Sequence, residues 1–203
     1  MKKAAKFALI KTIPIFLGYL FLGIAFGLLL QKSGLSVFWA FLISTLVYAG
    51  SMQFALVGIL TGGLSYVTTA VMTLFINSRH AFYGLTFIQR FKEMRKTYPY
   101  MVFSLTDETY SLLCSMARPA DFTDREWKAA TFFTAFFDQC YWIAGSVLGA
   151  LMGELITFDT TGIDFAMTAL FVVICVDQWK AAKTHIPAVT GFICGALFLV
   201  IIR

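Results

Sequence analysis

The stretch that decides the fold covers residues 33–78 and reads SGLSVFWAFLISTLVYAGSMQFALVGILTGGLSYVTTAVMTLFINS. It contains no Lys, Arg, Asp, Glu or His. Because one helical crossing of a bilayer needs about 20 largely apolar residues, this run alone is long enough for two crossings. Uncharged spans also cover 12–31 and 186–202. The sequence therefore predicts a protein that crosses a membrane several times.

The composition excludes an ordinary water-soluble domain. Of the 203 residues, 59% are hydrophobic and only 13% are charged, whereas soluble proteins carry about a quarter charged residues. The net charge is +5, from 16 basic and 11 acidic residues. The basic residues lie mostly between apolar segments, which indicates membrane topology rather than nucleic-acid binding. We expect a single transmembrane domain over 1–203, embedded in the lipid bilayer.

Hydropathy predicts an all-α polytopic membrane protein with about seven transmembrane segments. These cover 12–31, 36–61, 65–88, 99–117, 129–152, 164–179 and 186–202. Four lysines precede the first segment, at positions 2, 3, 6 and 11. The positive-inside rule therefore places the N-terminus in the cytoplasm.

One loop conflicts with seven plain crossings. The basic loop 89–98 would then lie outside, against the positive-inside rule. The conflict disappears if the chain between 36 and 118 contains broken or re-entrant elements, which are tolerated where they are buried in protein or line a cavity. We expect such elements near 48–56 and 100–112.

Two motifs fit these interruptions. Residues 48–54, YAGSMQF, place Gly50, Ser51 and Gln53 inside an apolar run. Residues 104–108, SLTDE, resemble a helix start with a hydroxyl cap and acids in the first turn. An interrupted helix exposes amides that favour a substrate carboxylate and carbonyls that accept an ammonium group. Gln53 could serve both ends of an amino acid; the alternative is a glycine kink with a hydrogen bond between helices.

Ionisable residues at membrane depth are the remaining candidates, because each costs at least about 2.5 kcal/mol there. Asp138 shares a helix face with Thr134, Trp142 and Gly145, so its carboxyl is expected to point into protein. It is a candidate for proton exchange; alternatively it is an acid bonded to Arg79 or to another buried group for structure alone.

Asp107 and Glu108 are candidates for proton exchange or for binding an ammonium group. They belong to a polar stripe on the fourth segment, which also includes Ser104, Ser111, Ser115 and Arg118. The alternative is a helix terminus at the water interface.

The segment Asn77-Ser78-Arg79-His80 follows the long uncharged run. Arg79 could bind a carboxylate through two hydrogen bonds, with Asn77 beside it, and His80 could exchange protons near neutral pH. Alternatively, Arg79 and His80 extend to the membrane interface.

Small residues recur four positions apart. The sets are Gly23 with Gly27, Gly58 with Gly62, Gly145 with Gly149 and Gly153, and Gly191 with Gly195. In lipid this spacing lets helix backbones approach closely. The sequence therefore predicts tight helix packing, within the chain or with a partner.

Four motifs together resemble the AzlC-type branched-chain amino acid permeases, the large subunit of the LIV-E exporters. They are residues 48–54, 77–85, 106–108 and 162–167, which occur in the family's order over most of the chain. The resemblance implies an inner-membrane protein that exports valine, leucine, isoleucine and often methionine by proton antiport, beside a small AzlD-type membrane subunit. The family's motif residues correspond here to Gly50, Ser51, Gln53, Asn77, Arg79, Asp107 and Glu108.

Other classes of function lack their motifs. There is no Walker loop, so coupling to an ion gradient or a partner is expected instead of ATP use. No HExxH or GxSxG motif is present, and the four cysteines have no CxxC spacing. We therefore expect no enzyme, no metal and no cofactor. The alternatives left open are a non-transporting assembly subunit and a channel for a small zwitterion.

Overall fold

The computed structural model describes residues 1–155, 162, 165, 168–169, 172, 175–176, 179–180, 182 and 184–201. Every regular element in these residues is helical, which confirms the all-α prediction. The chain divides into two compact units, Met1–Asp164 and Phe165–Arg203. The second contains α9 (Ile186–Ile201). The predicted segment 164–179 and the motif at 162–167 fall largely outside the described residues.

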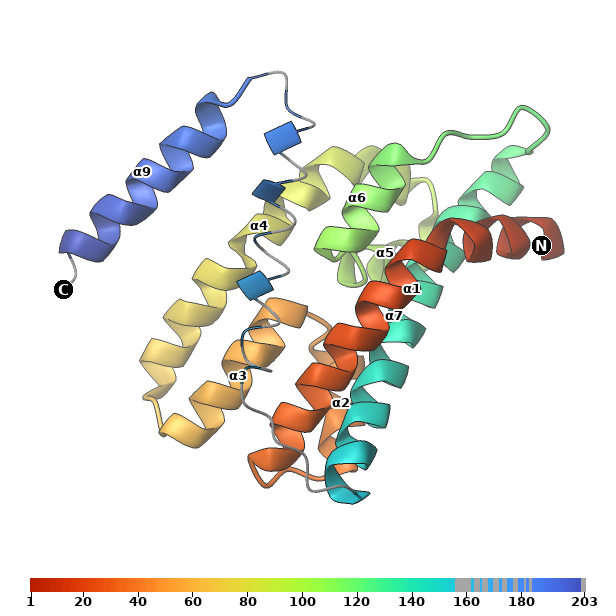
Figure 1. Ribbon diagram of the computed structural model, residues 1–203. Helices are drawn as coiled ribbons and strands as arrows, with labels where there is room; N and C mark the ends of the chain where they lie inside the picture. Colours follow the sequence, from red (N-terminus) through yellow and green to blue (C-terminus); the bar gives the residue numbers. More distant parts are fainter. Residues whose placement is uncertain are drawn as a thin grey trace. The chain divides into compact units, whose positions relative to one another are not determined.

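Three long helices form the frame of the first unit: α1 (Lys2–Lys32), α4 (Tyr66–Lys92) and α7 (Asp124–Leu155). At 1.5 Å per residue each is about 40 Å or longer, enough to cross a hydrocarbon layer of about 30 Å. Helices α1 and α7 lie side by side and run in the same direction, whereas α4 runs in the opposite direction (Figure 1).

The count of seven crossings is not confirmed. Among the described helices only α1 is both long and apolar enough to be a span by length and composition, with a mean hydropathy of 2.4 in its most apolar window. The physical reason is that the predicted segments 36–61 and 99–117 are each divided into two short helices. Helices α4 and α7 are long, but both carry charged residues near their centres.

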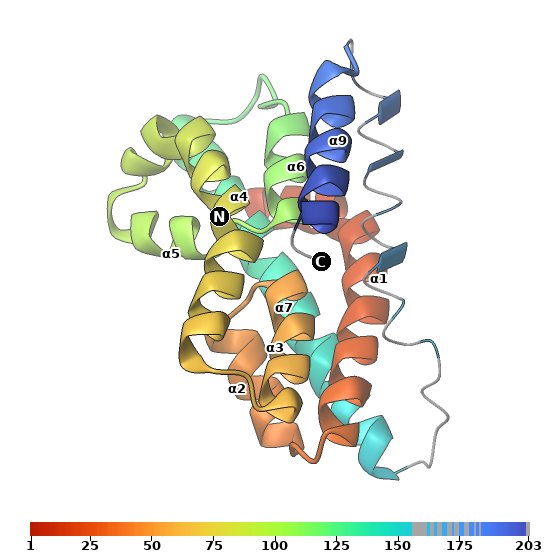
Figure 2. The ribbon, with the colours of Figure 1, turned by 90° about the vertical axis from the view of Figure 1, so that its left-hand side faces the viewer.

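The first interrupted segment consists of α2 (Val37–Leu46) and α3 (Gly50–Gly62). The break at 47–49 includes Tyr48 with a φ of 40°, a left-handed conformation that is uncommon for a residue with a side chain. Figures 1 and 2 show that α3 runs back toward the end of the unit at which α2 begins. The interruption expected near 48–56 is confirmed, although it lies at the start of that range and α3 is continuous beyond it.

The second interrupted segment consists of the 3-10 turn η1 (Arg95–Thr97), α5 (Tyr98–Phe103) and α6 (Asp107–Ser115). The chain breaks at 104–106, inside the range 100–112 in which an interruption was expected. The side chain of Thr106 caps α6 by accepting a hydrogen bond from the Thr109 amide. This hairpin enters from the end opposite to the α2–α3 hairpin (Figure 2).

Ion pairs identify which segments share an end of the first unit. Lys3 Nζ lies 2.8 Å from Asp121 Oδ2, and Lys128 Nζ lies 3.1 Å from Glu93 Oε2. These contacts bring the start of α1, the end of α4 and the start of α7 together. The basic loop 93–97 therefore lies at the same end as the N-terminus, because the α2–α3 hairpin returns to the end from which it started.

Glycines bring α1 and α7 into backbone contact. A Cβ atom added at Gly23 would lie 2.9 Å from Gly145 Cα, and one added at Gly27 would overlap the Ser146 carbonyl. The predicted tight packing is thus confirmed for these two helices. By contrast, a Cβ at Gly58 meets no atom of the described chain within 4 Å. The same holds for Gly191 and Gly195.

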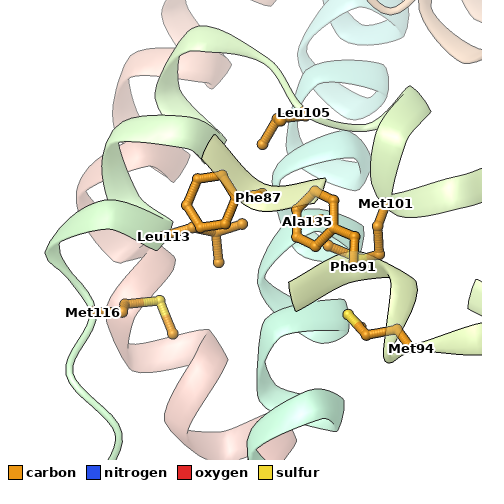
Figure 3. Close-up of a cluster of buried hydrophobic side chains, with 8 residues drawn as sticks. All are labelled: Phe87, Phe91, Met94, Met101, Leu105, Leu113, Met116 and Ala135. Atoms are coloured by element: carbon orange, nitrogen blue, oxygen red, sulfur yellow. The ribbon is translucent and has the colours of Figure 1, made fainter. Parts of the chain in front are cut away.

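A hydrophobic cluster fixes the second hairpin to α4 and α7, as Figure 3 shows. The rings of Phe87 and Phe91 on α4 stack with centroids 5.2 Å apart. Met101 and Leu113, from the two arms of the hairpin, are at most 1% exposed. This packing holds the arms of the hairpin in place, so the break at 104–106 has a fixed position.

Large apolar side chains are exposed on the described helices, and several polar side chains are buried between them. Large apolar side chains such as Phe21, Leu74 and Phe75 are about 70% exposed, at 72%, 70% and 69%. Buried polar side chains include Gln53, Ser104 and Asp138, each 0% exposed. Exposed apolar side chains together with buried polar groups suit a lipid environment.

Candidate functional site

The two hairpins meet at the middle of the long helices. Arg79 is the central residue of α4, and Asp138 lies beside the centre of α7. The rings of Tyr48 and Phe103, one from each break, have centroids 6.1 Å apart. Polar side chains from five helices gather around these breaks. We call the following set the central polar cluster: Tyr19, Ser51, Arg79, Tyr83, Thr106, Asp107, Glu108, Thr109 and Asp138.

One part of the cluster is an ion pair between α4 and α6. The Arg79 guanidinium lies 2.8 Å from the Asp107 carboxylate, and the two side chains are only 28% and 21% exposed. Tyr83 donates to the same carboxylate at 2.6 Å, and Arg79 also donates to the hydroxyl of Ser51. Arg79 therefore connects the first turns of α3 and α6, and the pair carries no net charge.

The N-terminus of α3 has no side-chain cap among the described residues, because Ala49 occupies the capping position. The Ala49 amide bonds instead to Gln53 Oε1 at 3.2 Å. The amides of Gly50 and Ser51 follow in the first turn, where a helix has no internal acceptors for them. Together with the helix dipole, these amides favour an anionic group beside Ser51 and Arg79.

Gln53 is occupied by contacts within the protein. It is 0% exposed, and its side-chain carbonyl accepts from Trp142 Nε1 at 2.9 Å. Its amide nitrogen donates to Ser44 Oγ at 3.3 Å. The hydrogen bond between helices considered as the alternative is present, and Gln53 links α2, α3 and α7 around the break.

Asp138 is completely buried, and its expected helix face points into the protein, with Thr134 and Trp142 buried beside it. Oδ2 accepts from the Thr109 hydroxyl at 2.8 Å, whereas Oδ1 has no hydrogen-bond partner in the described part of the chain. The alternative of a bond from Asp138 to Arg79 or another buried group is met by the buried Thr109, whereas Arg79 forms an ion pair with Asp107.

Glu108 and its neighbour Asp107 point in different directions. Glu108 is half-buried and accepts from the hydroxyl of Tyr19 on α1 at 2.7 Å, whereas Asp107 faces α4. The Tyr19 hydroxyl also lies 2.7 Å from Thr106 Oγ1. The two acids at the start of α6 therefore belong to separate groups of contacts.

The predicted polar stripe on the fourth segment is not one face of a helix. The break at 104–106 separates Ser104 from α6, and Ser111 and Ser115 are exposed. Arg118 lies beyond α6 and pairs with Asp124 at 2.5 Å. Only Asp107 and Glu108 of the stripe join the central polar cluster.

Asn77 and His80 lie near the ion pair. Asn77 Oδ1 is buried and has no hydrogen-bond partner among the described residues. The His80 ring lies against Tyr83, with centroids 5.8 Å apart.

Sequence reasoning missed Tyr19, Tyr83 and Thr109. Tyr19 is a hydroxyl-bearing residue near the centre of an otherwise apolar span, which is a usable signal. Thr109 follows the cap residue Thr106 by one turn, so its side chain is directed along the same face. Tyr83, by contrast, can be recognised as a cluster residue only from the structure, in which it donates a hydrogen bond from α4 to Asp107 on α6.

Unpartnered polar atoms gather at the two breaks. Tyr48 Oη and Ser104 Oγ are buried without a hydrogen-bond partner in the described residues, as is Asp138 Oδ1. Buried polar atoms in proteins are almost always hydrogen-bonded. Three exceptions at one place are typical of a site that receives polar groups from a solute or water.

The family model described as "AzlC protein" matches residues 14–156. The chain is 38% identical to the "Branched-chain amino acid transport protein AzlC" of Bacillus subtilis over 180 residues, which cover 89% of this chain and 70% of that protein.

Two further relatives carry membrane-protein names. An "Uncharacterized membrane protein" of Helicobacter pylori is 36% identical over 97% of this chain and 86% of its own length. The "Inner membrane protein YgaZ" of Escherichia coli is 26% identical over 92% of this chain and 77% of its own length. No solved structure matches the chain.

Proposed function

The chain belongs to the AzlC family, and on this premise we propose that it is a membrane transporter subunit for branched-chain amino acids. We further propose that it exports them across the inner membrane by proton antiport. The observation that carries the proposal is the meeting of two interrupted helices at mid-depth around a neutral Arg79–Asp107 pair.

A zwitterionic amino acid can bind between Arg79 and Asp107 without changing the net charge of the site. The substrate carboxylate takes the place of Asp107 beside Arg79, where Gly50 and Ser51 add the amides of the α3 N-terminus. The substrate ammonium group takes the place of Arg79 beside Asp107. Asn77 offers a further polar contact. Gln53 supports the site from behind through its bonds to α2 and α7.

Proton coupling is assigned to the acids of the central polar cluster. Asp138 and Glu108 are held by hydroxyl groups rather than by cations, so a change in protonation is not opposed by loss of an ion pair. Asp107 contributes to coupling because it exchanges its contact with Arg79 for a contact with the substrate ammonium group.

The positions of the basic residues indicate how the protein is oriented in the membrane. Lys2 and Lys3 lie at the same end as the basic loop 93–97 and the loop before α7. The positive-inside rule assigns this end to the cytoplasm. Loop 89–98 is then cytoplasmic, and the α2–α3 hairpin enters from the outer side.

A small AzlD-type membrane subunit is the partner that the family resemblance implies. The exposed apolar surface, including Phe75 and Phe82 of α4, is available to lipid or to such a subunit. A non-transporting assembly subunit remains the alternative function, and a channel for a small zwitterion is another.

Counterflow in proteoliposomes tests the proposal, with the partner subunit reconstituted alongside. Labelled leucine should accumulate in vesicles loaded with unlabelled leucine. Arg79→Lys should lower this exchange by at least about tenfold, because a compact ammonium group lacks the planar fork of N–H donors with which the guanidinium binds a carboxylate through two hydrogen bonds.

The matched control is Arg118→Lys, at a peripheral ion pair with Asp124, which should leave exchange unchanged. Absence of exchange with the partner present would favour the assembly role, and ungated leucine conductance would favour a channel.

A further inference from the structure

A continuous row of oxygen atoms joins Asp138 and Glu108, the two carboxyl groups of the central polar cluster that form no ion pair within the described part of the chain. Asp138 Oδ2 lies 2.8 Å from Thr109 Oγ1, which lies 3.2 Å from Thr106 Oγ1. Thr106 Oγ1 lies 2.7 Å from Tyr19 Oη, which lies 2.7 Å from Glu108 Oε2. All four distances fall within the range of hydrogen bonds.

The row of contacts needs one more proton than its hydroxyl groups carry. Four contacts between oxygen atoms need four protons, but the three hydroxyl groups supply only three, because each carries a single proton. If both carboxyl groups were ionised, one contact of 2.7–3.2 Å would hold two lone pairs facing each other. The fourth proton must therefore be held by Asp138 or by Glu108.

The hydrogen-bonding capacity of Thr106 is consistent with this count. Its oxygen also accepts from the Thr109 amide at 3.4 Å, so it makes three contacts in all. A hydroxyl group has one proton and two lone pairs. Thr106 can therefore accept from the amide, accept from one neighbouring hydroxyl and donate to the other, in either direction.

We propose that Tyr19, Thr106 and Thr109 form a proton relay that carries one shared proton between Asp138 and Glu108. In one state Asp138 is protonated and donates to Thr109, and each hydroxyl donates onward until Tyr19 donates to the Glu108 carboxylate. In the other state every hydrogen bond is reversed and Glu108 holds the proton.

The transfer is balanced at each atom. Each hydroxyl oxygen loses one proton and gains another, Asp138 loses one and Glu108 gains one, and no other reactant is needed. Four members of the relay are at most 5% exposed: Asp138, Thr109, Thr106 and Tyr19. Bulk water therefore does not compete for their protons. Glu108, at the other end, is only half-buried.

The surroundings contain other charged and titratable groups. Arg79 on α4 and Asp107 on α6 act electrostatically on Glu108, and Glu108 acts on Asp138. Three tyrosines lie within the electrostatic reach of these acids: Tyr48 at the first break, Tyr83 on α4 and Tyr100 on α5. Arg79 and Asp107 neutralise each other. The row of hydroxyl groups is thus a direct path between the buried Asp138 and the half-buried Glu108.

The role in coupling rests on the proposed function, but the shared proton does not. Infrared difference spectroscopy of the purified protein at neutral pH should detect the C=O stretch of one protonated carboxyl group. Asp138→Asn and Glu108→Gln should each alter that band. Two ionised carboxylates at neutral pH would overturn the relay even if the protein transports leucine.

Transport measurements test the path itself. Tyr19→Phe keeps the ring that packs on Trp142 and removes only the hydroxyl; Thr109→Val likewise keeps the volume. Each should reduce substrate-driven proton flux on the order of a hundredfold, as expected for loss of a positioned proton-transfer group. Leucine counterflow, which needs no net proton movement, should persist.

Two controls separate the relay from general damage. Tyr141→Phe removes a hydroxyl that bonds to Thr12 outside the relay and should keep wild-type proton flux. Thr109→Ser retains the hydroxyl and should restore most of the flux lost in Thr109→Val. Wild-type flux in Tyr19→Phe would overturn the relay. If leucine is not transported but the carboxyl band is present, the proposed function fails and the shared proton stands.

Discussion

Gln53 is the single residue on which the geometry of the first break most depends. Its side chain bonds to Ser44 on α2, to Trp142 on α7 and to the Ala49 amide at the break itself. A glutamine is suited to this position because it offers both a donor and an acceptor without a charge. Because no bulk water competes for these bonds in the interior, they hold the N-terminus of α3 in position next to Arg79.

Gln53→Leu should lower stability by about 1–2 kcal/mol, because it leaves the Trp142 indole N–H buried without an acceptor. Trp142→Phe removes the donor instead. If the bond is important, the double variant should lose less stability than the sum of the two single changes. Thermal unfolding of the four proteins in detergent measures this, and strictly additive losses would mean that the bond contributes nothing.

Several residues of the central polar cluster could be picked out from the sequence, but the contacts between them could not. Arg79, Asp107 and Asp138 are exceptional as charges within apolar segments, so each can be found from the sequence. Which acid pairs with the arginine depends on the path of the second hairpin, and the sequence suggested only Asp138 as a possible partner of Arg79. Tyr19 was missed because a tyrosine in an apolar span is not costly enough to attract notice.

At the level of elements, α1 and α7 form the most tightly packed pair. Gly23 and Gly27 of one helix face Gly145 and Gly149 of the other. When two helices approach closely, they make more van der Waals contacts. These contacts matter in lipid, because the hydrophobic effect does not drive helices together there. The pair therefore forms a rigid base for the two hairpins.

Gly27→Ala should destabilise the protein by roughly 1–3 kcal/mol, because the added methyl group overlaps the Ser146 carbonyl and the helices must separate. Gly58→Ala is the matched control: its Cβ meets no described atom within 4 Å, and alanine favours a helix by about 0.5–1 kcal/mol. Thermal unfolding distinguishes the two. Equal stability of both variants would contradict the tight packing.

The ends of the elements show what hydropathy can and cannot predict. The breaks were found because Gly50 and Ser51 interrupt an apolar run and Thr106 begins a capped helix. Helix α1, however, starts at Lys2 rather than at 12, and α7 starts at Asp124 rather than at 129. Hydropathy locates the apolar part of a helix, whereas charged residues continue the helix beyond it.

At the level of the whole first unit, one arrangement occurs twice in opposite directions. A long helix, α1, is followed by the α2–α3 hairpin, and a second long helix, α4, is followed by the α5–α6 hairpin. Because α4 runs opposite to α1, the hairpins enter from opposite ends. Inverted repeats of this kind are common in secondary transporters, with the binding site where the repeats meet.

Labelling from each side of the membrane should confirm which loops share a side. Cys114, Cys140, Cys175 and Cys194 are replaced by serine first, because all are exposed. Single cysteines at Lys2 and Lys96 should then react from the same side. A cysteine at Leu64, between α3 and α4, should react from the other.

Lys96 is preferred to its neighbour Arg95, whose φ of 48° is unfavourable for a replacement side chain. Reaction of the cysteines at 2 and 96 from opposite sides would contradict the returning path of the first hairpin.

The depth of the two hairpins also determines how the protein would sense voltage. Their tips lie at the centres of the long helices, so a proton arriving at Asp138 from either compartment crosses about half of the membrane. Moving one charge across the full membrane is worth about 2.3 kcal/mol per 100 mV, so each half-step would gain or lose about 1.2 kcal/mol. Binding of the proton from one side and its release to the other would then respond about equally to the electric field. Neither step alone would determine how the transport cycle depends on voltage.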